Sequence, residues 1–221
     1  MVVNTFFHHF FKFRHPTTIS VTGPSQAGKS QYVIKILQNL NFLMTSCPSQ
    51  IIWAYGVKNQ KQIDQILEIN PDVEFVEGVP DKNMFCDHDT DSLVILDDLM
   101  DEIGKNSGIS KLFTMDSHHC NTSVISILHN LFNQEKFSRT MSLNTHYSIL
   151  FPNKRDKSQF TRLNAQIFPT HPRFLQSALA LASQEPFNPV ILDMHPETPE
   201  SLSLISGLLP DQILTVNAPA G

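Results

Sequence analysis

The segment Gly23–Ser30, with the sequence GPSQAGKS, constrains the fold of this chain more than any other part of it. It matches the pattern G-x-x-x-x-G-K-S in full. The apolar run Ile19–Val21 leads into it, and Ser30–Asn41, with apolar residues at helical spacing, follows it. A glycine-containing turn between a strand and a helix points successive backbone N–H groups at a phosphate, and the helix adds its positive N-terminal end. The sequence therefore predicts an α/β protein that binds the phosphates of a nucleotide.

Two residues of this loop are predicted to bind ATP and Mg²⁺ through their side chains. Lys29 is expected to reach the β- and γ-phosphates, and the Ser30 hydroxyl to coordinate Mg²⁺. Backbone groups of the loop and of the first helical turn supply the other contacts. The predicted nucleotide-binding residues are Gly23, Pro24, Ser25, Gln26, Ala27, Gly28, Lys29, Ser30 and Gln31.

A second element provides the acids that such a site needs. The apolar run Leu93–Leu96 is followed directly by Asp97 and Asp98. A buried strand that ends in an acid delivers a carboxylate to the edge of the sheet beside the phosphate loop, where Mg²⁺ binds. Asp97 is therefore predicted to be the second metal ligand, with Ser30. Asp98 points elsewhere and is predicted to orient or deprotonate the attacking water.

A later apolar run, Ser123–Leu128, ends in His129 and Asn130. Asn130 is predicted to lie close to the γ-phosphate and to hold the nucleophilic water. The alternative is an Asn that only satisfies a turn at the end of a strand.

Seven short apolar runs predict strands, and they alternate with segments of helical periodicity at Ser30–Asn41, Lys58–Ile69 and Phe174–Ala182. Near-continuous apolar runs are typical of strands buried on both faces of a parallel sheet. The pattern predicts a three-layer α/β sandwich of the P-loop NTPase type, with an added strand between the P-loop strand and the acid strand, as in RecA-like proteins. The predicted strands are Thr18–Val21, Ile51–Tyr55, Val73–Val76, Leu93–Leu96, Ser123–Leu128, Tyr147–Phe151 and Val190–Leu192.

The predicted ATPase domain covers residues 18–200, with a lead segment at 1–17, a tail at 201–221 and loose chain ends. The polar stretch Asp101–Asn121 is expected to be a mobile functional loop with a short helix. The three cysteines, Cys47, Cys86 and Cys120, are far apart and odd in number. A disulfide framework is therefore not expected, and a reducing, intracellular setting is.

His118, His119 and Cys120 raise the alternative of a zinc site. Adjacent residues rarely ligate one ion together, so a polar loop that contacts DNA or a neighbouring subunit is the preferred interpretation.

The formal net charge of −5 argues against a protein that coats DNA through an overall basic surface. Residues 72–102 hold eleven acids against one Lys or Arg, and residues 136–162 hold six Lys or Arg against one acid. The two regions could meet head to tail in a ring, or the basic region could face phosphates; two ordinary solvated surfaces are the alternative. The apolar stretches are far shorter than the ~20 residues of a membrane-spanning helix, and the Phe-rich start does not resemble a signal peptide, so no membrane or secreted location is expected.

Taken together, several of these segments resemble the viral genome-packaging ATPases of the FtsK–HerA superfamily, in the form found in poxviruses, virophages and the Polinton/adintovirus group. The string downstream of the phosphate loop is the more specific part of the resemblance. The matching segments are Gly23–Ser30, Leu93–Leu99, Ser117–Val124, His129–Phe132, Arg139–Asn144, Pro152–Gln159 and Asp193–Pro199.

The resemblance implies a hexameric ring motor that hydrolyses ATP and drives double-stranded DNA into a preformed capsid at its portal vertex. It would act in the host nucleus or cytoplasm, or on the virion. Carried over to this sequence, Lys29 and Ser30 form the Walker A site, Asp97 is the Walker B acid, Asp98 the catalytic carboxylate and Asn130 the sensor. Arg139 or Arg155 would be the arginine finger that reaches the next subunit's γ-phosphate.

Three positions depart from the family pattern: His129 replaces the more frequent Gln, Asp98 stands where many relatives have Glu, and Cys120 replaces a basic residue. The alternatives to a packaging motor are another FtsK–HerA-type DNA motor or helicase, or a nucleotide-binding assembly factor with little hydrolysis. A relic without activity would be expected to have lost phosphate or metal residues. Because Lys29, Ser30, Asp97 and Asp98 are all present, we expect ATP hydrolysis.

Overall fold

The computed structural model describes residues 2–6, 11–86, 90–99, 120–131 and 143–219. The strands are β1 (Val2–Phe6), β2 (Thr18–Thr22), β3 (Gln50–Tyr55), β4 (Glu74–Glu77), β5 (Ser92–Asp97), β6 (Thr122–Leu128), β7 (Tyr147–Leu150), β8 (Val190–Asp193), β9 (Leu204–Ser206) and β10 (Leu214–Ala218). The helices are α1 (Lys29–Gln38), α2 (Leu40–Leu43), α3 (Gln60–Ile69), α8 (Ser158–Ile167) and α9 (Phe174–Ala182), with 3₁₀ turns η2 (Lys82–Met84) and η4 (Glu200–Leu202).

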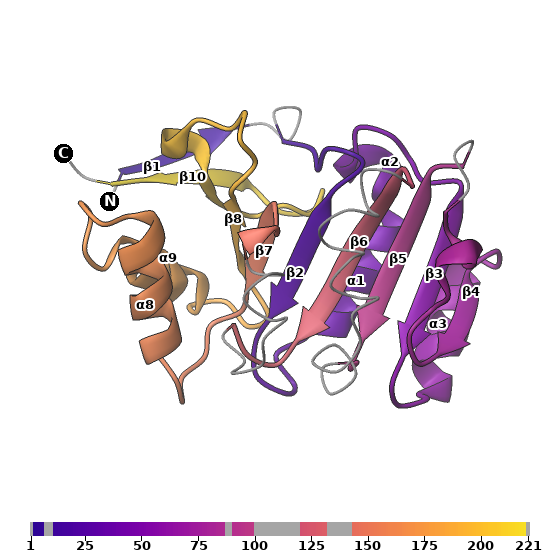
Figure 1. The fold of residues 1–221 in the computed structure, drawn as a ribbon. Coiled ribbons are helices and arrows are strands. Elements are labelled where there is room, and N and C mark those ends of the chain that lie inside the picture. Colours follow the sequence, from indigo (N-terminus) through magenta and orange to yellow (C-terminus); the bar gives the residue numbers. More distant parts are fainter. Residues whose placement is uncertain (1, 7–10, 87–89, 100–119, 132–142, 220–221) are drawn as a thin grey trace.

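All these strands belong to one sheet in the order β1-β10-β9-β8-β7-β2-β6-β5-β3-β4 (Figure 1). Within the run β7-β2-β6-β5-β3-β4, neighbouring strands are parallel to each other. The pairs from β7 through β8, β9 and β10 to β1 are antiparallel. In this order β6 lies between the P-loop strand β2 and the acid strand β5.

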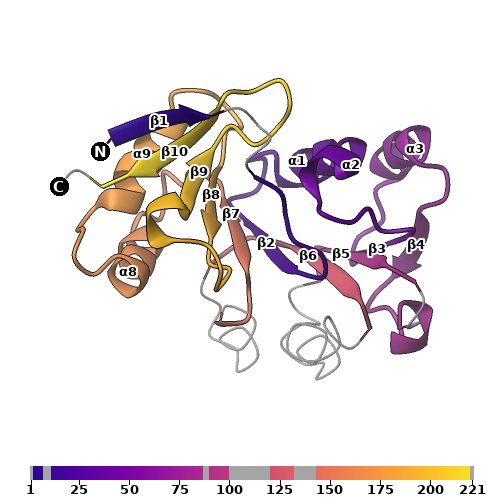
Figure 2. The same ribbon diagram turned by 90° about the horizontal axis from the view of Figure 1, so that it is seen from above.

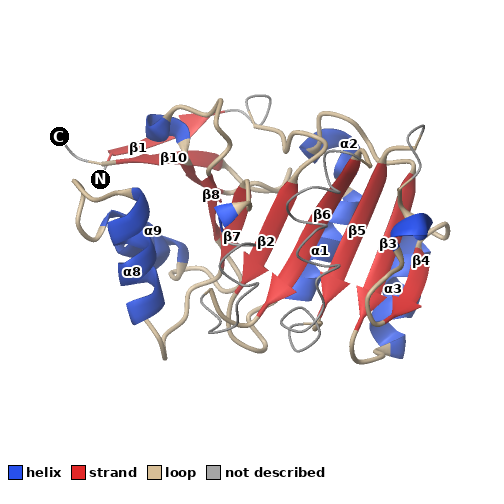
Figure 3. Ribbon diagram, viewed as in Figure 1, coloured by secondary structure: helices blue, strands red, loops and turns tan. Residues whose placement is uncertain are grey.

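Helices cover the sheet on both faces, which makes the three layers of an α/β sandwich (Figures 2 and 3). Helices α1, α2 and α3 lie on one face, where Val33 and Ile36 of α1 pack with Ile19 and Val21 of β2 in the largest apolar cluster. Helices α8 and α9 cover the other face beside the antiparallel strands, and their apolar side chains pack with those of β7, β8 and β9. Successive side chains of a strand point to opposite faces of the sheet, so one strand contributes residues to the apolar clusters on both faces. The predicted α/β fold class with a mostly parallel central sheet is confirmed.

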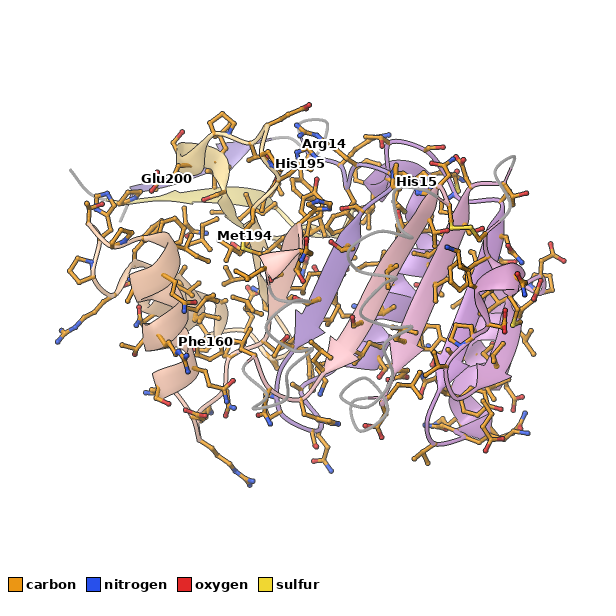
Figure 4. The ribbon with its side chains drawn as sticks, viewed as in Figure 1. Arg14, His15, Phe160, Met194, His195 and Glu200 are labelled. Atoms are coloured by element: carbon orange, nitrogen blue, oxygen red, sulfur yellow. A yellow bond between two sulfur atoms is a disulfide. The ribbon has the colours of Figure 1, made fainter. Side chains whose placement is uncertain are left out.

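Each predicted strand is present, but the expectation of loose chain ends is wrong. Residues Val2–Phe6 pair with Leu214–Ala218 as β1 and β10, so segments of both chain ends lie in the same sheet as the predicted ATPase domain. The lead into β2 is also held in place. Arg14 contacts His195 and forms an ion pair with Glu197 at 3.0 Å (Figure 4). Pairing between distant chain ends produces no local periodicity, which is why the sequence did not predict it.

Two helical assignments also differ from the prediction. The helix expected over Ser30–Asn41 is divided at Asn39, whose backbone is not helical (φ −123°, ψ 23°), into α1 and α2. Helix α8 was not predicted, although Phe160 and Leu163 are buried three residues apart on its inner face. Most of the expected functional loop Asp101–Asn121 lies outside the described residues.

A disulfide joins Cys86 and Cys120, which contradicts the expectation of unpaired cysteines. Cys86 follows η2 and Cys120 precedes β6, and the Thr122 hydroxyl donates to the Phe85 carbonyl oxygen at 3.2 Å between them. The two cysteines are 34 residues apart in the sequence, and the sheet brings them together. Their spacing in the sequence therefore did not indicate the bond. Cys120 is thus unavailable as a zinc ligand, and His118 and His119 lie outside the described residues. Among the described helices, none is long and apolar enough to cross a membrane.

Candidate active site

The predicted phosphate loop connects β2 to α1 at the carboxyl end of the parallel strands, the lower edge of the sheet in Figure 1. Two of its residues have left-handed backbone conformations, Gln26 with φ 65° and Gly28 with φ 92°. Gly28 is also the N-cap of α1 and has no side chain to cap the helix. The first N–H groups of the helix are therefore not satisfied by a cap and remain available to an anion such as phosphate.

Lys29 is buried, and its ammonium group folds back over the loop. The Nζ atom donates to the carbonyl oxygens of Gly23 at 2.9 Å and Pro24 at 3.0 Å. Burial lowers the pKa of Lys29, and the negative charges of Asp97 and Asp98 act in the opposite direction. The positive charge thus lies within the loop, against these two carbonyl groups.

Asp97 ends β5 and faces the first turn of α1. The Ser30 Oγ donates to Asp97 Oδ1 at 3.4 Å, and the Gln62 amide of α3 donates to Oδ2 at 2.8 Å. Burial raises the pKa of Asp97, although both hydrogen bonds lower it. A hydroxyl and a carboxylate at this separation fit a Mg²⁺ ion that takes its other ligands from phosphate and water. Over the described ranges, no group of three or more His, Cys, Asp or Glu could hold a metal by itself.

Asp98 follows in a left-handed backbone conformation (φ 56°). Its carboxylate is half-exposed, and Oδ1 lies 3.2 Å from His129 Nε2. The backbone of Asp98 passes so close to Gly56, at the end of β3, that a Cβ on Gly56 would lie 2.3 Å from the Asp98 carbonyl oxygen. Gly56 is therefore required for the position of Asp98.

Asn130 follows β6 at the same edge of the sheet and is exposed. Since β6 lies between β2 and β5, Asn130 lies between the phosphate loop and the two aspartates. Its Oδ1 accepts a hydrogen bond of 3.4 Å from Gln159 of α8. The same Gln159 donates to Asp156 at 2.6 Å and accepts from the Leu131 N–H at 2.9 Å.

The structure brings the loop, both aspartates and Asn130 together at one edge of the sheet. The other predicted residues are Arg155, Arg139 and Gln31. Arg155 is exposed in the segment between β7 and α8, and Arg139 lies outside the described residues. The side chain of Gln31 exchanges two hydrogen bonds with Gln65 of α3, at 3.0 and 3.1 Å. The carboxylate of Asp156 accepts hydrogen bonds from Ser158 and Gln159 in the first turn of α8.

Three residues of the site were missed from the sequence: Gln62, Gly56 and Gln159. Gln62 lies in the first turn of α3, and a polar residue at that point carries no signal in a periodicity analysis. Gly56 follows the predicted strand 51–55 directly, and a glycine at a strand end is the one signal that was available. Gln159 belongs to the unpredicted helix α8.

No protein family model matches this sequence, and no curated protein matches it either. Solved structures do match the fold. The genome-packaging NTPase B204 of Sulfolobus turreted icosahedral virus 2, in complex with ATP-γS, is 11% identical with a TM-score of 0.53, and the match covers 83% of this chain and 94% of that one. The DNA-packaging ATPase B204 of Sulfolobus turreted icosahedral virus is 11% identical with a TM-score of 0.54, covering 94% and 100%.

A third match is EssC (ATPases 2 and 3) from Geobacillus thermodenitrificans, 11% identical with a TM-score of 0.52, covering 92% of this chain and 39% of that one. At these identities the similarity concerns the fold. The chain therefore has the α/β fold shared by the viral packaging ATPase B204 and the EssC ATPases, with a phosphate loop, two strand-end acids and a polar strand end at one edge of its sheet.

Proposed function

We propose that this chain hydrolyses ATP and uses the energy to move double-stranded DNA into a viral capsid. The observation that carries the proposal is the meeting of five side chains, from α1, β5 and β6, at the carboxyl edge of three adjacent strands. They are Lys29, Ser30, Asp97, Asp98 and Asn130. Binding at this edge is the general rule for open α/β sheets.

In the proposed mechanism, Lys29 turns from the loop carbonyls to the β- and γ-phosphates, with the N–H groups at the start of α1 around them. Ser30 and Asp97 hold Mg²⁺, which neutralises charge on the phosphate oxygens. Asp98, on the exposed side of the site, accepts the proton of the attacking water or orients it. Asn130 donates to the same water from the neighbouring strand.

DNA is proposed as the partner because of the exposed basic side chains beside the site, and because the fold matches a protein described as a DNA-packaging ATPase. Lys154, Arg155 and Lys157 are all exposed between β7 and α8. This segment leaves the same edge of the sheet as the phosphate loop, since β7 is parallel to β2. A conformational change on ATP hydrolysis would therefore occur next to the DNA phosphates.

A homo-oligomeric ring is proposed from the charge distribution. The exposed acids Asp72, Glu74, Glu77 and Asp81 lie at and beside β4, the strand that ends the sheet on one side. The exposed bases before α8 lie beyond β7, five strands away (Figure 1). Opposite charges at two well-separated places along the sheet suit head-to-tail association, in which Arg155 or Arg139 would reach the γ-phosphate of the next subunit.

The test is steady-state ATP hydrolysis with and without double-stranded DNA. We expect DNA to stimulate the wild type, Lys29→Ala to lose nucleotide binding and Asp98→Asn to bind ATP but hydrolyse it at least ~100-fold more slowly. Glu68→Gln, an equal change of charge at an exposed position of α3, serves as the control. The motor proposal fails if DNA has no effect on the rate, or if Lys29→Ala keeps full activity.

One contact favours a second candidate, a nucleotide-binding assembly factor with slow hydrolysis. His129 lies 3.2 Å from the Asp98 carboxylate and competes with water for it. If this contact limits hydrolysis, His129→Gln should raise kcat. If His129→Gln and the wild type have the same kcat, this candidate loses its support.

A further inference from the structure

A second recess adjoins the phosphate loop at the same edge of the sheet. Val190 at the start of β8 pairs with Leu150 at the end of β7, and also with Ser206 at the end of β9. The loop before β8 (183–189) and the loop after β9 (207–213) therefore both lie at the edge where β7 and the neighbouring P-loop strand end. These two loops lie beside the site described above, on the side of the antiparallel strands.

A cavity of about 470 Å³ opens between these two loops and the end of α9. This volume lies in the range of ligand pockets. Its walls combine the apolar carbons of Ala178 and Ala182 with the carboxylates of Glu185 and Asp211, and the described lining residues include no Lys or Arg. The lining suits a neutral group that donates hydrogen bonds, and it does not suit a phosphate.

Asn188 gives this cavity a specific polar contact. It is one of the lining residues, and its Oδ1 atom is buried with no hydrogen-bond partner among the residues that the structure describes. A buried acceptor without a partner is unfavourable by the free energy of its lost hydration. A ligand that places an N–H group against Asn188 Oδ1 would remove this penalty.

The preceding residue, Phe187, connects the cavity to the phosphate loop. Phe187 is 65% exposed as a residue, yet it lies over Gly28, where a Cβ would be 3.0 Å from Phe187 Cδ1. Phe187 also has a left-handed backbone (φ 60°), which is uncommon for an aromatic residue. Strained residues of this kind concentrate at ligand sites. The loop thus presents a ring face beside the P-loop and an amide in the cavity.

We propose that this cavity binds the adenosine of ATP, an assignment that rests on the proposed function in placing the phosphates at Gly23–Ser30. The adenine amino group donates to Asn188 Oδ1, and the adenine ring stacks on Phe187. The ribose hydroxyls donate to Glu185 or Asp211. A purine with a carbonyl oxygen in place of the amino group presents an acceptor to Asn188 Oδ1 and binds more weakly.

The test compares the affinities of ATP, inosine triphosphate and inorganic tripolyphosphate, each measured with Mg²⁺ by competition against a fluorescent ATP analogue. The wild type should prefer ATP over inosine triphosphate by about tenfold, the value of one hydrogen bond. Asn188→Leu should lose this preference and leave tripolyphosphate affinity unchanged. Phe187→Ala should weaken both nucleotides about tenfold, and tripolyphosphate not at all. Ser183→Ala, in the same loop but outside the cavity lining, is the control.

The outcomes separate the two proposals. Equal affinity of the wild type for ATP and inosine triphosphate, or wild-type preference in Asn188→Leu, overturns the adenosine assignment and leaves the phosphate loop intact. Unchanged tripolyphosphate affinity in Lys29→Ala overturns the proposed function itself. A preference between two ligands is measured within one protein sample, so it does not depend on the fraction of a variant that folds.

Discussion

At the scale of single residues, the site depends on how Asp97 is held. Its carboxylate is buried at the end of β5, and burial raises its pKa, which opposes the charge that Mg²⁺ binding requires. The Gln62 amide acts in the other direction by donating to Oδ2 at 2.8 Å. Hydrogen-bond donors behind a metal ligand typically affect metal affinity by 10- to 100-fold. Gln62 is therefore a positioning residue of the proposed Mg²⁺ site.

Replacing Gln62 should weaken Mg²⁺ binding without affecting the phosphate loop. We expect Gln62→Leu to raise the Mg²⁺ concentration needed for half-maximal ATP hydrolysis by about tenfold, because Asp97 loses the hydrogen bond that favours its ionised form. Gln60→Leu, two residues earlier, is the control, since that side chain donates to the exposed Asp64 on the same helix. An unchanged Mg²⁺ requirement in Gln62→Leu would show that the contact has no functional role.

The raised pKa of Asp97 also predicts how stability depends on pH. The folded state holds the proton of Asp97 more tightly than the unfolded state, so the ionised carboxylate lowers stability, fully above the raised pKa and not at all below the ordinary pKa of the unfolded state. In urea denaturation without nucleotide, Asp97→Asn should be more stable than the wild type by about 1 kcal/mol at pH 7. The difference should shrink as the pH falls through the raised pKa and disappear below the ordinary pKa of an aspartate. Asp72→Asn should show no such difference, and equal stabilities of wild type and Asp97→Asn at pH 7 would contradict the assignment.

At the scale of elements, helix α8 contacts the segment after β6 that carries Asn130, the proposed sensor. Gln159, in its first turn, contacts Asn130, the Leu131 N–H and Asp156 at once. We expect Gln159→Leu to lower the free energy of unfolding by about 1–2 kcal/mol, because the Leu131 N–H loses its acceptor. It should also lower kcat for ATP with little change in KM, since Asn130 is no longer fixed.

Chemical denaturation and steady-state kinetics measure both effects, and Gln166→Leu on the exposed side of the same helix is the control. A loss of stability with an unchanged kcat would limit Gln159 to a structural role.

The elements also show how far sequence alone could go. The parallel strands were predictable because burial on both faces makes their apolar runs nearly continuous, and the phosphate loop because backbone geometry restricts its residues. Strands β1 and β10 depend on pairing between the two chain ends, and the Cys86–Cys120 bond on the position of η2 beside β6. The contacts of Gln62 and Gln159 depend on where α3 and α8 dock against the sheet. Such positions are set by tertiary packing, which a local pattern does not encode.

At the scale of the whole molecule, exposed acids and exposed bases lie at two separate parts of one sheet. The exposed acids lie near β4, whereas Lys154, Arg155 and Lys157 lie beyond β7, next to the proposed catalytic edge. With a net charge of −5, the chain can attract DNA only through such a local basic surface. The position of these bases then decides whether DNA binds near the nucleotide.

Removing this basic surface should weaken DNA binding in a way that salt reveals. Each Lys or Arg that contacts a phosphate contributes about 0.9 to the slope of log affinity against log salt concentration. We therefore expect the triple variant Lys154→Ala, Arg155→Ala, Lys157→Ala to reduce the slope by up to about 3, measured by fluorescence anisotropy with labelled duplex DNA. A second triple variant on the opposite face, Lys35→Ala, Lys58→Ala, Lys61→Ala, changes the net charge equally at exposed positions of α1 and near α3. If both triple variants reduce the slope alike, DNA responds only to net charge, and the segment before α8 is not its contact surface.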